Sequence, residues 1–321
     1  MKDFIIEFLP ELEAPQPNTR PIRIAVLDTG FCDDNEDNIL RHRHEKVLRH
    51  LSRNYVGNGN ERGNYADTYG HGTHVVRLIL QLAPRAEVVV LKVTEGVSLA
   101  GTTLQQIEEA LRWAAGAAEC DIINLSLGLG DRAVQTLRPV IKELIDRGKL
   151  IFAASSNAGL NGRLPFPANQ NGVFAIHATD SKGNIPNGIN VPSERYQNNF
   201  ATLGYQVPSR WKGKEIFKTG TSFATPVAVA IAADVLEFVR RAPPRLQSNN
   251  RQHFFTYRGM RQILEHMSTA SGNYDYIRPW RNDMFDLNSP NIDYMHEKLR
   301  RMSTSSCSDG CRMCQSSTQM L

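Results

Sequence analysis

Residues 121–155 read DIINLSLGLGDRAVQTLRPVIKELIDRGKLIFAAS. The stretch begins with an apolar run at 121–127 and ends with another at 149–155, each of a length typical of a buried strand. Between them, residues 133–148 carry apolar side chains at helical spacing and end on Gly148, which supplies a C-terminal cap. Two such strands joined by an amphipathic helix predict a βαβ unit with parallel strands.

The same alternation extends in both directions from this unit. Apolar strand-like runs occur at 22–28, 87–93 and 172–178, and residues 104–118 carry a helical stripe. From about residue 21 to 240 the chain therefore predicts an α/β fold of three layers, in which a mainly parallel sheet has helices on both faces. Ligands of such sheets bind where loops leave the carboxyl ends of the strands, so we expect the chemistry there.

Composition is that of an ordinary globular protein. Of the 321 residues, 41% are hydrophobic and 22% are charged, and the formal net charge is +4. This charge is too weak to imply nucleic acid, and no apolar stretch reaches the roughly 18 residues of a membrane span. The N-terminus does not resemble a signal peptide, because Glu7, Pro10 and Glu11 interrupt its apolar run.

Two basic runs stand out. Residues 41–53, RHRHEKVLRHLSR, are best interpreted as a solvated face, with contact to nucleic acid or an anionic surface as the alternative. Residues 205–218, YQVPSRWKGKEIFK, precede a candidate nucleophile, and they are interpreted either as a solvated loop or as a segment that alters access to it.

The five cysteines are an odd number, and three of them crowd one end of the chain. They are Cys32, Cys120, Cys307, Cys311 and Cys314. This pattern is not a disulfide framework, and it predicts free thiols in a reducing, cytoplasmic (intracellular) setting.

The candidate nucleophile is Ser222, in TGTSFATPVAVA at 219–230. Serine is common at helix starts because its hydroxyl caps free backbone N–H groups, so capping is the simpler interpretation. The alternative is a nucleophile held at a turn in front of a helix. That role needs a base, an orienter for the base and a donor for the oxyanion.

The chain offers one candidate for each of these partners. His71 lies between two glycines before an apolar helix, Asp28 ends an apolar strand run, and Asn157 follows another. Each also has a simpler interpretation, as a structural histidine, a turn-capping carboxylate and a turn asparagine. All three are expected at the ligand-binding edge of the sheet, and acyl transfer needs them together with the nucleophile.

Five short segments then carry a family resemblance. They are AVLDTG (25–30), GHGTHV (70–75), SLG (126–128), SSNAG (155–159) and GTSFATP (220–226). In this order they resemble the signature segments of the subtilisin-like serine peptidases, the subtilases of peptidase family S8. GHGTHV and GTSFATP are highly specific, and the resemblance covers about residues 21–240.

The resemblance implies a serine endopeptidase that hydrolyses peptide bonds through an acyl-enzyme on Ser222. Asp28, His71 and Ser222 would form the triad, and the Asn157 amide with the backbone N–H of Ser222 would form the oxyanion hole. Thr221 would support them, and no redox or organic cofactor is implied. The residues expected to bind substrate, the first three as a strand along its backbone, are Ser126, Leu127, Gly128, Ala154, Ser155 and Ser156.

Two departures from the family pattern matter for the site. The family has glycine before the oxyanion asparagine, whereas this chain has Ser156, which adds a side chain beside the pocket. Many secreted members insert a calcium-holding loop after the active-site histidine, whereas Gln81–Glu87 offers a single carboxylate. Because calcium takes six to eight oxygen ligands, we expect no calcium site after His71, and calcium elsewhere is left open.

The chain is predicted to divide into an N-terminal extension at 1–20, a peptidase domain at 21–280 and a partly disordered C-terminal tail at 281–321. Only 27 residues precede Asp28, too few for the folding segment of secreted members. The alternative function is therefore a catalytically weak peptide-binding or effector module of a larger sensor-type protein. The expected partner is a polypeptide substrate, within or beside a larger multidomain assembly, with no nucleic acid and no membrane.

Overall fold

The computed structural model describes residues 19–33, 37–57, 61–96, 99, 102–159, 162–190, 199–241, 248–279, 297 and 299–303. Its strands are β1 (Arg23–Asp28), β2 (Arg53–Asn54), β3 (Glu61–Arg62), β4 (Glu87–Lys92), β5 (Ile122–Leu125), β6 (Leu150–Ala154), β7 (Val173–Thr179), β8 (Phe200–Leu203), β9 (Val207–Trp211), β10 (Lys214–Lys218), β11 (Ser268–Ser271) and β12 (Tyr274–Ile277). Its helices are α2 (Asn38–Arg43), η1 (His44–Lys46), α3 (His71–Leu82), α4 (Leu104–Ala115), α5 (Ala133–Asp146), α6 (Thr221–Arg241), α7 (Ser248–Phe254) and α8 (Tyr257–His266).

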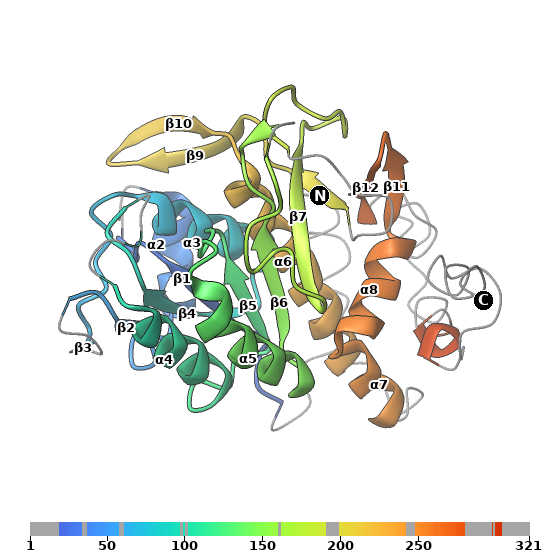
Figure 1. Cartoon of the computed structure of the whole chain (residues 1–321), viewed down its shortest axis with the longest axis horizontal. Helices are drawn as coiled ribbons and strands as arrows, with labels where there is room; N and C mark the ends of the chain where they lie inside the picture. Colours follow the sequence, from blue (N-terminus) through green and yellow to red (C-terminus); the bar gives the residue numbers. More distant parts are fainter. Residues whose placement is uncertain are drawn as a thin grey trace.

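One ten-stranded sheet organises these elements, in the order β11-β12-β8-β7-β6-β5-β1-β4-β2-β3 (Figure 1). From β2 through β4, β1, β5, β6, β7 and β8 to β12, every neighbouring pair is parallel. Among the described strands, antiparallel pairing is confined to β2–β3, β11–β12 and the separate hairpin β9–β10. The mainly parallel sheet expected from the strand–helix alternation is thus confirmed.

Helices cover both faces of the sheet. Along β1, Ile24 and Val26 belong to one buried cluster, and Ala25 and Leu27 belong to another, as the two-residue period of a strand requires. The first cluster contains the apolar faces of α3, α6 and α8, and the second contains those of α4 and α5. The two clusters and the sheet between them make the three layers that the sequence predicts.

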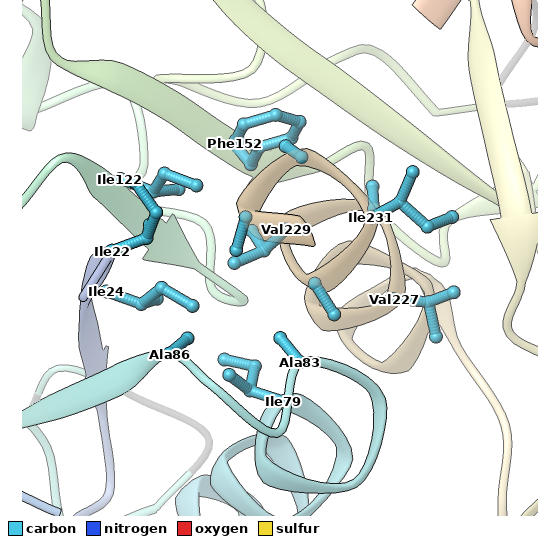
Figure 2. Packing of buried hydrophobic residues seen from close by; sticks show 14 of the residues in the cluster. Ile22, Ile24, Ile79, Ala83, Ala86, Ile122, Phe152, Val227, Val229 and Ile231 are labelled. Carbon is cyan, nitrogen blue, oxygen red and sulfur yellow. The ribbon is translucent and has the colours of Figure 1, made fainter. Parts of the chain in front are cut away.

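The central helix of the first cluster is α6. In Figure 2, Val229 of α6 points toward Ile122 and Phe152 of the sheet, while Ile79 of α3 lies below it. The window Thr221–Arg240 is long and apolar enough, with a mean hydropathy of 1.6, to pass as a membrane span, but 94% of it is buried inside the fold. Its composition is therefore that of a core helix packed on all sides.

The element boundaries differ from the sequence predictions by a few residues. The helix expected at 104–118 ends at Ala115, where the Gly116 N–H closes the last turn on the Arg112 carbonyl. The strand expected at 121–127 ends at Leu125, so the segment 126–128 lies beyond it. Residues 205–218 are not a loop, because most of them form the hairpin of β9 and β10.

Most of the predicted terminal segments lie outside the described residues. These include residues 1–18 of the N-terminal extension and Cys307, Cys311 and Cys314. Part of the predicted tail is described, however. Leu299 is fully buried in the cluster that contains α6, so this part of 281–321 packs onto the domain.

Candidate active site

Three neighbouring strands end at one edge of the sheet. Asp28 is the last residue of β1, Ser126 follows β5, and Ala154 is the last residue of β6. Because these strands are adjacent and parallel, their carboxyl ends bring the three residues to the same edge. Asp28 is only 1% exposed, so its carboxylate needs hydrogen-bond partners inside the protein.

His71 is one of those partners. Its Nδ1 lies 2.7 Å from Asp28 Oδ1, which also accepts a hydrogen bond from the Thr29 backbone N–H. Burial lowers the pKa of His71, but the charge and hydrogen bond of Asp28 outweigh burial, so this pKa lies above its ordinary value. The bond to Asp28 favours a proton on Nδ1 and leaves Nε2 as the basic nitrogen.

The first turn of α3 is fixed by Asp67. Its Oδ1 accepts a hydrogen bond from the Gly70 N–H, and its Oδ2 accepts from the N–H and the hydroxyl of Thr73. Burial raises the pKa of Asp67, but these bonds outweigh burial and leave the pKa below its ordinary value. Sequence reasoning missed Asp67, although an aspartate shortly before a helix start is a recognisable capping signal.

Close packing explains the two glycines around His71. A Cβ on Gly72 would lie 2.3 Å from the Gly30 carbonyl oxygen, in the turn after β1. A Cβ on Gly70, whose φ is 98°, would lie 3.0 Å from the ring of Trp211 in the β9–β10 hairpin. His71 is therefore held between the turn that follows Asp28 and the hairpin.

Ser222 is the second residue of α6, directly after Thr221. It lines one cavity of about 270 Å³ together with Asp28 and His71. Among the described side chains, no hydrogen bond joins the Ser222 hydroxyl to His71; such bonds are often long in the absence of substrate and tighten in its presence. The lining residues are Asp28, Thr29, Tyr69, His71, Thr94, Gly96, Leu99, Ser126, Leu127, Gly128, Ala154, Ser156, Asn157, Pro165, Thr221 and Ser222.

Asn157 is tied to the start of α6 through its side-chain oxygen. Its Oδ1 accepts hydrogen bonds from the Thr221 backbone N–H at 2.8 Å and from the Thr221 hydroxyl at 3.2 Å. A Cβ on Gly220 would lie 2.9 Å from the Asn157 amide nitrogen, Nδ2. Thr221 thus fixes the orientation of the amide, and Gly220 leaves room for the nitrogen beside Ser222.

Of the six residues expected to bind substrate, five line the cavity, and Ser155 does not. The Ser155 backbone N–H continues the pairing of β6 with β7 by donating to the Ile176 carbonyl, and Ser155 is fully buried. Its placement on the pocket wall is therefore corrected. Ser156 has a backbone φ of 89°, a conformation that residues other than glycine rarely adopt. Its hydroxyl accepts a hydrogen bond from the Ala158 N–H.

The hairpin β9–β10 is joined to α3 close to the site. Ser209 Oγ and His74 Nδ1 share a hydrogen bond of 2.7 Å, and the His74 ring packs on Trp211. Burial, helped by the charges of Lys218 and His71, lowers the pKa of His74 to about 3, so its ring is neutral. Phe223 of α6 completes the contact, with its ring centroid 5.2 Å from that of His71.

Comparison with known proteins places this geometry in a family. The family described as the subtilase family, Peptidase_S8, matches residues 19–279. The chain belongs to the subtilase family. As a subtilase with named proteases among its relatives, it is a serine-type endopeptidase with a polypeptide as substrate.

Individual relatives agree with this assignment. The chain is 35% identical to the subtilisin-like protease het-Q2 of Podospora anserina, over 68% of its own length and 70% of that protein. It is 30% identical to the M-protease of Shouchella clausii, over 66% of itself, and spans only about half (53%) of that protein. It is 28% identical to the major intracellular serine protease of Bacillus subtilis, over 68% of itself and 69% of that protein.

A solved structure agrees on the fold. The S41 psychrophilic protease has a TM-score of 0.65 with this chain at 23% sequence identity, over 87% of this chain and 97% of that one. At that identity the likeness concerns the α/β architecture alone, which is the subtilisin-like fold expected from the sequence.

Proposed function

We propose that this subtilase cleaves peptide bonds through an acyl-enzyme on Ser222, with Asp28, His71 and Ser222 as the triad. The observation that carries the proposal is the 2.7 Å bond between Asp28 and His71, at a cavity that Ser222 also lines. An imidazole oriented by a buried carboxylate next to a serine is the arrangement that activates a weak nucleophile.

In the proposed mechanism, Ser222 Oγ attacks the carbonyl carbon of the scissile bond while His71 Nε2 takes the serine proton. Asp28 stabilises the imidazolium that results, because its carboxylate faces the Nδ1 proton. His71 then gives the proton to the leaving amine, and the C–N bond breaks. Water, with His71 as base, hydrolyses the acyl-enzyme and returns Ser222 to its starting state.

The oxyanion would be held by Asn157 Nδ2 and the backbone N–H of Ser222. Support comes from Thr221, whose two hydrogen bonds occupy Asn157 Oδ1 and turn the amide nitrogen into the cavity. The Ser222 N–H belongs to the first turn of α6, where no earlier helical carbonyl accepts it. Both donors would therefore be in place before substrate arrives, and such preorganisation makes oxyanion stabilisation effective.

Labelling with a fluorophosphonate probe tests the proposal. The probe reacts with an activated serine, so we expect labelling of the native chain and none of Ser222→Ala. Cleavage of a casein substrate should follow the same pattern. Folded native protein that neither labels nor cleaves would overturn the proposal.

The second candidate is a catalytically weak peptide-binding or effector module of a larger sensor-type protein. Ser156 is the observation that favours it, because a strained residue beside Asn157 could displace the oxyanion donor. Folded protein that binds peptide without labelling would support this module.

The remaining expectations are retained as proposals. We place the peptidase domain at 21–280, with no cofactor, no nucleic acid and no membrane as partner, and leave participation in a larger assembly open. A cytoplasmic setting is supported by the relative named as an intracellular protease and by the free thiol of the buried Cys120.

A further inference from the structure

Lys218 is the last residue of β10, four residues before Ser222. In the antiparallel hairpin it lies directly opposite Val207 of β9. Opposite residues of such a pair project to the same face, and Val207 packs inward with Leu78 of α3 and with Phe223. Lys218 therefore projects toward α3 and Phe223, whose ring packs on that of His71, whereas its neighbour Phe217, 70% exposed, projects away.

The electrostatics agree with this placement. Lys218 is close enough to His71 for its charge to lower the histidine pKa, against the larger effect of Asp28. Burial lowers the pKa of Lys218 itself, and only Asp67 opposes that effect. The ammonium is thus partly desolvated beside the site, where an anion would stabilise it.

No carboxylate of the described chain forms an ion pair with Lys218. The charge of Asp67 acts on Lys218, but the two oxygens of Asp67 already accept four hydrogen bonds. The donors are the backbone N–H groups of Tyr69, Gly70 and Thr73 and the Thr73 hydroxyl. The other lysine on the same face of β10, Lys214, is exposed at the far end of the strand. Of these two lysines, Lys218 is the one that combines partial burial, proximity to His71 and the absence of an ion-pair partner among the described residues.

The position of His71 indicates which segment of the substrate lies beside Lys218. Lys218 is not among the residues that line the cavity around Ser126–Gly128 and Ala154. His71 donates its proton to the amine that leaves, so the released segment passes the side of Ser222 that carries His71 and the hairpin. We propose that Lys218 binds an acidic side chain, aspartate or glutamate, in the substrate segment directly after the cleaved bond.

The proposal rests on the proposed peptidase function and adds the class of substrate. A carboxylate there would form a partly desolvated ion pair with the ammonium of Lys218, which is stronger than a fully exposed pair. Such a pair gives selectivity between glutamate and its neutral isostere glutamine, and the selectivity should fall as salt rises.

The test uses the full chain and peptides that are identical except for Glu, Gln or Lys after the cleaved bond. We expect the native enzyme to cleave the Glu peptide with a kcat/KM about fivefold above that of the Gln peptide. In Lys218→Met the ratio should fall to about one, and in Lys218→Glu the Lys peptide should become the better substrate. Lys214→Met, which removes the same charge from the same strand, should keep the native ratio.

Binding gives a second readout that does not depend on turnover. On the Ser222→Ala background, the Glu peptide should bind more tightly than the Gln peptide, and Lys218→Met should abolish the difference. Equal treatment of Glu and Gln by the native chain, or a ratio that survives Lys218→Met, would overturn the inference. Absence of cleavage and labelling with the binding preference intact would instead reject the peptidase mechanism and retain the Lys218 contact.

Discussion

The side-chain oxygen of Asn157 accepts a hydrogen bond from the Thr221 backbone N–H at 2.8 Å. This contact connects the loop after β6 to the first turn of α6, which carries Ser222. It fixes which end of the Asn157 amide is available to the cavity. The oxygen is used by the protein, which leaves the nitrogen as the donor that the proposed oxyanion hole requires.

Replacing Asn157 by Asp should therefore separate the two roles. The oxygen contact to Thr221 survives, but the donor is lost and a negative charge faces the oxyanion. We expect kcat to fall by about 10² to 10³, the size of loss measured for one oxyanion donor in subtilisin, with KM and the unfolding temperature little changed. Steady-state kinetics and circular dichroism check this, and an unchanged kcat would remove Asn157 from the site.

The pH dependence of cleavage should report the Asp28–His71 pair. His71 must be neutral to act as base. Burial and, less strongly, Lys218 lower its pKa, but Asp28, helped by Asp67, outweighs them and keeps the pKa above the ordinary 6.5. Activity should therefore be lost as pH falls through a value above 6.5. Asp28→Asn should lower the midpoint and reduce kcat by about 10⁴. A profile of kcat/KM whose acidic limb is the same in both proteins would contradict this.

The interaction between Asp28 and His71 also makes the stability of the fold depend on pH. Because the folded-state pKa of His71 is raised, protonated His71 stabilises the fold below pH 6.5, and this contribution disappears as pH rises through the folded-state value. Catalysis and this stabilisation thus require opposite protonation states of one ring.

Ser156→Gly should stabilise the protein. Ser156 holds a φ of 89°, and such strain costs about 1–3 kcal/mol, whereas the extra freedom of glycine in the unfolded chain costs about 0.5–1 kcal/mol. The net gain of about 1 kcal/mol should raise the unfolding temperature by about 2 °C. Ser156→Ala is the matched control, since it removes the bond to the Ala158 N–H and keeps the strain. If both variants melt at the same temperature, strain at Ser156 is not the cause.

Calcium should not bind in the segment Gln81–Glu87. Its one carboxylate, Glu87, already pairs with Arg23 at 3.1 Å, and Glu87 is the first residue of β4. Calorimetric titration should detect no tight site there. Tight binding that is lost when Gln81 and Glu87 are replaced by alanine would show the opposite.

The sequence predicted the parts of the fold that depend on local periodicity. The strand β1 and the helix α5 each carry their apolar residues at the spacing that their burial requires. The sequence did not predict the hairpin β9–β10, because its apolar pattern is short and contains Pro208. The hairpin also depends on contacts with α3, such as the hydrogen bond between Ser209 and His74. The burial of Leu299 also depends on packing between distant segments, which no local pattern encodes.

For the site, residue types and order predicted Asp28, His71, Asn157 and Ser222, and all four line one cavity. The ends of β1 and β6 bring Asp28 and Asn157 there, and the starts of α3 and α6 bring His71 and Ser222. The same reasoning placed Ser155 wrongly, because the strand pairing continues one residue past β6 and turns this side chain inward. It also missed Trp211, whose relation to His71 depends on a hairpin that the sequence did not predict.

Trp211 should act on catalysis through the position of His71. Its ring covers Gly70, the residue before His71, and packs on His74 in the same helix turn. Removing the ring in Trp211→Ala should let the start of α3 shift, and a displacement of about 1 Å can reduce turnover about 10²-fold. We expect the loss in kcat rather than KM, with recovery in Trp211→Phe, which keeps an aromatic face. A loss of stability without a change in kcat would instead give Trp211 a purely structural role, as measured by thermal unfolding beside steady-state kinetics.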